Sequence, residues 1–370
     1  MASHIDSPDE GPPLGYLPIP DMVADWPWQR KINPLYEEVA AEGNAWLRSF
    51  LPFNLKSQHA FEKGDFGLLA ALTFPDVPRD QLRTCVDLFN VFFLVDEYTD
   101  VEPAPKVREI IEVSIDALHN PRKPRPDGEV IIGEVVRQFW DRGRKTVPHH
   151  NGEPFVASLV DYLHAVAAQA EARDSGTILR TADAYLAIRR EDAGVRPLYV
   201  LGALFLSIPD HLHDDPPLTR LTRLGCDLVA IDNDVLSYNR EQAAGNVDFS
   251  IVTITMHDNG LSPHDAARSL VERIAELEAQ FMQCHEFCSF GAGGLDGPSD
   301  SRVQRYMDHM GNMRRAIWCW SFECGRYFGE RGSTYAKTQV IPLIPKKIRD
   351  PNLHGNQVDV FLIEEELAKM

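Results

Sequence analysis

The amino-acid sequence predicts an all-α protein with a single domain, and three observations support this prediction. From about residue 33 onward, most segments carry apolar residues at helical rather than alternating spacing. No Asn-Gly hairpin signal lies between alternating strands. Breakers rich in Pro and Gly separate the apolar segments, but none is long enough to mark a linker between domains.

The expected helices follow one another along the chain, each ended by a breaker. The stretch from Tyr36 to Leu47 shows the helical pattern most clearly. Residues 87–95 are apolar on nearly every side and could form a buried strand, but together with 79–86 they are long enough to predict a central helix. The full set of expected helices covers residues 36–47, 64–75, 79–98, 106–119, 130–147, 152–173, 178–193, 195–207, 217–243, 263–287 and 299–328.

Two segments flank this predicted helical domain. Residues 1–30 are rich in Pro and acidic residues and are expected to form an irregular arm. The helical domain itself is expected over residues 31–345, with a C-terminal tail over residues 346–370.

The charge balance argues against a nucleic acid or an anionic membrane as the main partner. The chain has 37 Lys and Arg against 55 Asp and Glu, a formal net charge of -18, whereas either partner requires a basic surface. No secretory signal and no run of about 18 apolar residues is visible. We therefore expect no membrane span, a cytoplasmic protein, and free thiols at its cysteines.

A first acidic cluster ends the apolar helix. Asp96 and Asp100 are four residues apart, so their carboxylates lie on one helical face. Two carboxylates beside an apolar run are costly unless a cation or water compensates them. A helix end emerging into solvent would explain the same pattern.

A second oxygen-rich cluster lies in the predicted helix 217–243. Asn233, Ser237 and Glu241 recur every four residues and therefore form one stripe. Their amide, hydroxyl and carboxylate oxygens are the hard ligands that Mg²⁺ accepts. Since the stripe carries one formal negative charge, it would need a polyanionic ligand such as a phosphate to complete the metal coordination. The alternative is a polar stripe on an exposed helix.

Two arginine-containing features could bind that polyanion. A helix that carries Arg189 and Arg190 meets Gly194 and then Pro197, which predicts a helix break beside a cationic side chain. Arg326 and Tyr327 end an aromatic-rich helix and could donate hydrogen bonds to a phosphate. A basic helix end and an Arg that extends over a hydrophobic core are the alternatives.

Taken together and in this order, these motifs resemble those of the class I terpene cyclases, specifically the fungal, basidiomycete-type sesquiterpene synthases. The resemblance spans roughly residues 17–345 and rests on an aspartate-rich motif from Asp96 to Asp100, on the Asn-Asp-x-x-Ser-x-x-x-Glu motif from Asn233 to Glu241, and on the Arg-Tyr pair. The family often has two adjacent aspartates in its first motif, whereas this chain has Glu97 in second place, so the role of Glu97 is open.

The resemblance implies a helical bundle around a central aromatic-lined cavity, with three Mg²⁺ ions at its mouth. Asp96 would bind metal directly, Asp100 would support it, and the Asn233, Ser237 and Glu241 stripe would hold the third ion. The family's roles also imply a diphosphate-sensing Arg190, an effector Gly194 with Ala193 as linker, and Trp320 in the cavity. Diphosphate binding is expected from four residues: Arg190, Arg240, Arg326 and Tyr327.

The expected cavity has aromatic side chains below the metal site. Phe89, Phe92 and Phe93 lie seven, four and three residues before Asp96 and thus on roughly its face. Aromatic rings stabilise a carbocation by cation–π attraction. Ordinary core packing would explain the same residues.

The resemblance implies that the protein cyclises (2E,6E)-farnesyl diphosphate, as a monomer or homodimer. The expected route is 1,11-closure through a humulyl cation to a cyclic hydrocarbon such as Δ6-protoilludene, with diphosphate as the second product. A chain-elongating prenyl transferase and a non-catalytic helical scaffold are the competing hypotheses.

Overall fold

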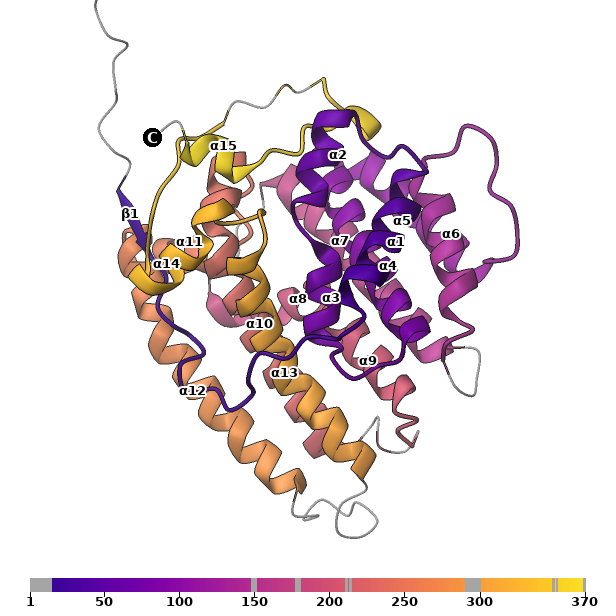
Figure 1. Ribbon diagram of the computed structural model, residues 1–370. Coiled ribbons are helices and arrows are strands. Elements are labelled where there is room, and N and C mark those ends of the chain that lie inside the picture. Colours follow the sequence, from indigo (N-terminus) through magenta and orange to yellow (C-terminus); the bar gives the residue numbers. More distant parts are fainter. Residues whose placement is uncertain are drawn as a thin grey trace, which may run out of the picture.

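The computed structural model describes residues 15–147, 152–176, 181–209, 212, 215–289, 301–347, 350 and 352–368. Helices dominate, and the two short strands β1 (Tyr16–Pro18) and β2 (Val340–Pro342) form one antiparallel pair. The prediction of a single all-α domain is therefore confirmed (Figure 1).

The helices of the first half are α1 (Tyr36–Arg48), α2 (Leu55–Glu62), α3 (Phe66–Thr73), α4 (Arg79–Thr99), α5 (Ala104–His119), α6 (Ile132–Gly143) and α7 (Glu153–Ser175). Those of the second half are α8 (Ala182–Asp192), α9 (Val195–Phe205), α10 (Pro216–Ala244), α11 (Ile251–Asn259), α12 (Pro263–Ser289), α13 (Ser301–Glu323), α14 (Gly332–Thr338) and α15 (Ile363–Leu367). Helices α2, α11, α14 and α15 are short and were not predicted. A short apolar stripe gives little periodic signal, which explains why the sequence did not indicate them.

Helix α4 is the central helix of the first half. It packs against α1, α3 and α6, and nearly every residue from Leu82 to Thr99 is buried. These contacts on several sides explain why residues 87–95 are apolar on nearly every side.

Helix α10 has the same role in the second half, where it packs against α8, α12 and α13. Its start is fixed by Asp215, whose side chain accepts a hydrogen bond from the Leu218 amide at 3.2 Å. Two prolines occupy its first turn, where no intrahelical N–H is needed. It ends at Gly245, which adopts φ +84° as a left-handed cap.

The break expected between Arg190 and Pro197 lies at Gly194. Helix α8 ends at Asp192, α9 begins at Val195, and Gly194 between them has φ +69°. Only glycine adopts this backbone conformation at little cost. The break places Gly194 against Phe92 of α4, while Arg189 near the end of α8 reaches Asn233 of α10.

Both segments that flank the predicted helical domain pack onto it. Trp26 is buried, and Arg315 donates hydrogen bonds to the carbonyls of Val23, Trp26 and Trp28. Near the other end, Val358 and residues 360–363 are buried against the bundle. Residues 1–14, which begin the predicted arm, and residues 348, 349, 351, 369 and 370 of the predicted tail lie outside the described residues.

No helix among the described residues has both the length and the hydropathy that crossing a membrane would require.

Candidate active site

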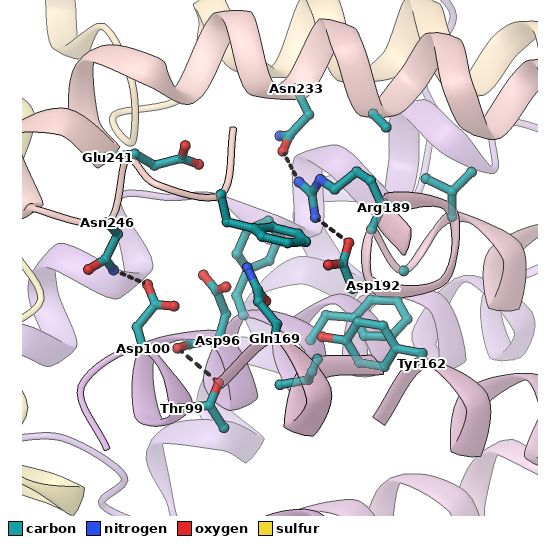
Figure 2. A pocket seen from close by; sticks show the side chains of 18 of the residues that line it. Asp96, Thr99, Asp100, Tyr162, Gln169, Arg189, Asp192, Asn233, Glu241 and Asn246 are labelled. Carbon is teal, nitrogen blue, oxygen red and sulfur yellow. Dashed lines mark hydrogen bonds and ion pairs between the residues drawn. The ribbon is translucent and has the colours of Figure 1, made fainter. Parts of the chain in front are cut away.

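A cavity of about 240 Å³ lies among α4, α7, α10, α13 and the break between α8 and α9. Its walls are apolar and aromatic on one side and carry acidic, amide and guanidinium groups on the other. Figure 2 shows the polar part, with Asn233 and Glu241 on one helix and Asp96 and Asp100 opposite them. The two motifs that the sequence singled out therefore face one cavity.

Helix α4 contributes both the aromatic and the acidic wall. Phe89, Phe92, Phe93, Asp96 and Asp100 all line the cavity, as their helical spacing predicts. The Phe92 ring packs edge-on against Tyr162 of α7 with 4.8 Å between centroids. The cavity thus changes from aromatic to acidic along a single helical face.

Helix α10 contributes the opposing oxygen donors. Asn233 and Glu241 line the cavity, and Ser237 lies between them along the helix, buried at 1% exposure. The Ser237 hydroxyl has no hydrogen-bond partner within the described residues.

The two acidic groups that face the cavity are hard to ionise in the protein alone. Burial, together with the nearby Asp100, raises the pKa of Asp96 to about 7. Burial and the charge of Asp234 raise the pKa of Glu241 to about 8. Burial is the largest cause of both shifts.

The donor set fits a hard divalent cation. Every candidate ligand supplies oxygen, the type of ligand that Mg²⁺ requires, and the raised pKa values of Asp96 and Glu241 are those expected where a cation would compensate buried carboxylates. Within the described residues, no three acidic, imidazole or thiol side chains converge on one point. The donors instead lie on both sides of the cavity, so a shared anionic ligand would have to complete the coordination.

Glu97 faces away from the metal donors and joins two arginines. Its buried Oε1 accepts hydrogen bonds from Arg240 at 2.7 Å and from Arg326 at 2.8 Å. Arg326 also donates to Asp96 at 3.1 Å, and its guanidinium lies 4.7 Å from the Phe93 ring centroid. Both arginines line the cavity. Glu97 therefore holds two guanidinium groups at the polar end of the cavity.

Arg190 is a predicted site residue that the structure places elsewhere. It pairs with Asp227, at 2.5 Å and 3.0 Å, and is not part of the cavity lining. Its neighbour Arg189 lines the cavity and donates to Asn233 at 3.1 Å and to Asp192 at 2.9 Å (Figure 2). Successive residues of a helix point about 100° apart, so Arg189 reaches Asn233 and Arg190 reaches Asp227 on the same neighbouring helix, α10.

Trp320 is also outside the cavity lining. It is fully buried, its indole N–H donates to the carbonyl oxygen of Gly64 at 2.7 Å, and its ring packs against Phe93 and Tyr327. Trp320 therefore supports two lining residues from behind. Met313 and Ile317 are the α13 residues that line the cavity.

The remaining predicted residues lie where the sequence indicated. Gly194 lines the cavity beside its linker residue Ala193. Tyr327 also lines it, and the amide of Asn233 donates to the Tyr327 hydroxyl at 3.4 Å.

Sequence reasoning missed the wall formed by α7. Tyr162, Val166, Gln169 and Arg173 line the cavity, and their spacing of four, three and four residues is a helical stripe. This stripe passes from apolar to polar just as that of α4 does. That pattern in the sequence could have predicted that α7 lines the cavity. Asn246, in the turn after α10, was also missed; it donates to Asp100 at 2.7 Å (Figure 2).

Residues 87–280 match the model of terpene synthase family 2, C-terminal metal binding. The chain is 42% identical over 354 residues to sesquiterpene synthase 14 of Postia placenta, covering 95% of this chain and 99% of that protein. It is also 42% identical over 342 residues to Delta(6)-protoilludene synthase 8 of the same fungus, covering 92% and 98%.

Solved structures resemble the fold at lower identity. The linalool/nerolidol synthase of Streptomyces clavuligerus superposes with a TM-score of 0.69 at 19% sequence identity, covering 80% of this chain and 99% of that one. This similarity concerns the helical fold.

Proposed function

The chain belongs to the terpene synthase family and has the activity of a terpene cyclase, and from this premise we propose that it converts (2E,6E)-farnesyl diphosphate into a cyclic sesquiterpene with Mg²⁺ as cofactor. One observation carries the proposal. The oxygen donors of α4 and α10 face each other across the polar end of a cavity whose other walls are aromatic and aliphatic. Such a cavity suits a ligand with a polyanionic head and a hydrocarbon chain.

Five residues would hold the metal: Asp96, Asp100, Asn233, Ser237 and Glu241. Three Mg²⁺ ions are expected, and when bound they would supply the positive charge that makes diphosphate a good leaving group.

The chain's own cations would bind and orient the diphosphate. Arg240 and Arg326 lie at the polar end of the cavity, and Tyr327 offers a phenolic donor there. We assign the role predicted for Arg190 to Arg189, because Arg189 is the arginine of that pair that lines the cavity. Donors fixed in a buried site stabilise the charge that develops on the departing diphosphate.

Ionisation leaves an allylic cation, which the aromatic wall is suited to hold. The rings of Phe89, Phe92 and Phe93 can stabilise it by cation–π attraction, and the apolar lining excludes water that would quench it. We propose 1,11-closure to a humulyl cation and Δ6-protoilludene as product, a choice supported by the names of relatives at about 40% identity.

The direct test is incubation of the purified protein with farnesyl diphosphate and MgCl₂, followed by gas chromatography–mass spectrometry of the volatiles. We expect one dominant tricyclic hydrocarbon with the retention time and spectrum of Δ6-protoilludene. A different cyclic hydrocarbon would overturn the product assignment only. A longer prenyl diphosphate, formed when isopentenyl diphosphate is added, would favour the chain-elongating alternative.

Substitution of the proposed metal ligands tests the site. Asp96→Asn and Asn233→Ala should each lower kcat/KM by at least roughly a hundredfold, because each removes a ligand from the group that activates the diphosphate. Circular dichroism and thermal unfolding should show that both variants remain folded. Near-normal turnover in either variant would contradict the metal assignment.

A further inference from the structure

Residues 352–368, the last described segment of the C-terminal tail, are anchored to the bundle through the backbone. Ser57 of α2 donates through its hydroxyl to the Val358 carbonyl at 2.7 Å and accepts from the Val360 amide at 3.2 Å. Figure 1 shows α15 and the chain before it at the same end of the molecule as α2. Val358, Val360 and Phe361 are buried at 1%, 1% and 4% exposure. The tail is therefore packed into the molecule rather than laid on its surface.

Phe361 of this tail lies against a cation of the active site. The guanidinium carbon of Arg240 is 5.3 Å from the centroid of the Phe361 ring. The ammonium of Lys347 is 4.9 Å from the same centroid, and Lys347 is fixed by an ion pair with Asp359 at 2.9 Å. The Phe361 ring is thus in contact with two cations, and one of them, Arg240, lines the cavity.

Arg240 has few other means of staying in place. Its side chain is buried, and it shares the Glu97 carboxylate with Arg326. Its Nε has no hydrogen-bond acceptor within the described residues. A desolvated cation gains most from an aromatic face, so the Phe361 ring is a substantial part of what holds this guanidinium.

From this geometry we infer that the C-terminal tail is part of the diphosphate-binding end of the active site, with Phe361 as a positioning residue that seats Arg240. The inference deepens the proposed function and rests on it. Phe361 does not line the cavity itself and acts through Arg240.

The test measures the affinity for inorganic diphosphate in the presence of MgCl₂ by isothermal titration calorimetry on the full-length protein. Phe361→Leu keeps an apolar side chain and removes the aromatic face, and it should weaken diphosphate binding about tenfold. Phe361→Met does the same with a more flexible side chain, in case the Leu variant does not fold. Phe139→Leu, the same change at a fully buried ring on α6 outside the cavity lining, is the matched control and should leave the affinity unchanged.

A double-mutant cycle separates positioning from general packing. If Phe361 acts through Arg240, then Phe361→Leu should change the affinity less than about twofold once Arg240→Met is already present. The same loss on both backgrounds, or no loss in either the Leu or the Met variant, would overturn the inference.

The outcomes also distinguish this inference from the proposed function. If the parent protein cyclises farnesyl diphosphate while Phe361→Leu and Phe361→Met bind diphosphate normally, only the positioning role of Phe361 is overturned. The opposite outcome is coupling between Phe361 and Arg240 in calorimetry with no cyclic product from farnesyl diphosphate. It would support the positioning role of Phe361 and overturn the proposed function.

Discussion

Glu97 shows how a single buried side chain organises the cations of the site. Arg240 and Arg326 would repel each other without it, and each donates to the same carboxylate oxygen. The shared carboxylate keeps both guanidinium groups at the polar end of the cavity, where an incoming anion can meet them. The second position of the acidic motif therefore has a role that differs from that of Asp96.

This arrangement predicts a large effect of removing the Glu97 charge. Glu97→Gln should lower the free energy of unfolding by about 3 kcal/mol, because two buried guanidinium groups would lose their shared counter-charge. Denaturant unfolding at pH 7.5 measures the change, and Glu97→Asp, which keeps the charge, should lose clearly less. Equal stability of the Gln variant and the parent would refute the bridging role.

The two neighbouring arginines of α8 offer a matched comparison. Arg189→Gln should lower kcat/KM by roughly a hundredfold, since Arg189 faces the cavity and donates to Asn233. Arg190→Gln should change kcat/KM by less than about threefold but lower the free energy of unfolding by about 2 kcal/mol, because Asp227 would stay buried without its partner.

Steady-state kinetics and denaturant unfolding of both variants check this pair. A larger kinetic loss at Arg190 than at Arg189 would restore the assignment made from the sequence.

The accuracy of the predictions for individual side chains depended on helix phase. The side chains of α4 from Phe89 to Asp100 were placed correctly because one long helix fixes their relative directions. Arg189 was missed in favour of Arg190 because motif spacing alone does not say which face of α8 meets α10. Only packing of the whole bundle determines that orientation.

The break between α8 and α9 is the element whose geometry the site depends on most directly. Gly194 has φ +69°, and a Cβ at this position would lie 3.5 Å from the Phe92 ring. Gly194→Ala should cost about 1 kcal/mol of unfolding free energy through backbone strain. It should also change the product distribution, because the added methyl group meets an aromatic ring that lines the cavity.

Gly176→Ala is the control for this prediction. Gly176 ends α7 with φ +63°, and a Cβ there meets no described atom within 4 Å. Both variants should lose similar stability in denaturant unfolding, while gas chromatography should show an altered product distribution for Gly194→Ala alone. An unaltered product distribution in Gly194→Ala would show that the break between α8 and α9 does not determine which product forms.

Helix α10 uses two faces, and the sequence predicted only one of them. On the cavity side it presents Asn233 and Glu241. On another side Asn239 donates to the Pro342 carbonyl at 3.0 Å and accepts from the Ile344 amide at 3.0 Å. The partners of Asn239 are backbone groups, which leave no mark in the sequence, so this attachment of the C-terminal segment could not be predicted.

At the scale of the whole molecule, helical periodicity was sufficient to predict the all-α class, whereas the bundle around a central cavity was expected from the family resemblance. Long apolar stripes on α4, α7 and α10 are strong local signals, and short connections leave few ways to assemble them. The contribution of the flanking segments was not predictable in the same way. Val23 is buried and accepts a hydrogen bond from Arg315, 292 residues away. Phe361 is buried beside Arg240 of α10, far from it in the sequence, and the local sequence of both residues has no regular period.

Acid sensitivity of the folded state is a property of the whole molecule to which His309 contributes. The imidazole lies against Gly202, where a Cβ would come within 2.6 Å of the ring, and its centroid is 4.6 Å from that of the tilted Phe74 ring. Burial in these surroundings lowers the pKa of His309 from its ordinary 6.5 to about 4, although hydrogen bonds to the carbonyls of Leu198 and Thr73 oppose the shift.

The sign of the effect follows from proton binding in the two states. Between pH 6.5 and about 4 the unfolded chain holds a proton on His309 that the folded protein lacks. The contribution of His309 to stability is therefore complete above pH 6.5 and falls as the pH drops through this window, by about 3 kcal/mol in total. Urea unfolding of the parent at pH 7.5 and pH 4.5 should show this loss, and His309→Gln should show a smaller one whatever its stability at pH 7.5. An identical pH dependence in the two proteins would mean that other groups account for the acid sensitivity, such as the carboxyl groups of Asp116, Glu134 and Asp141, whose pKa values are lowered by arginine partners.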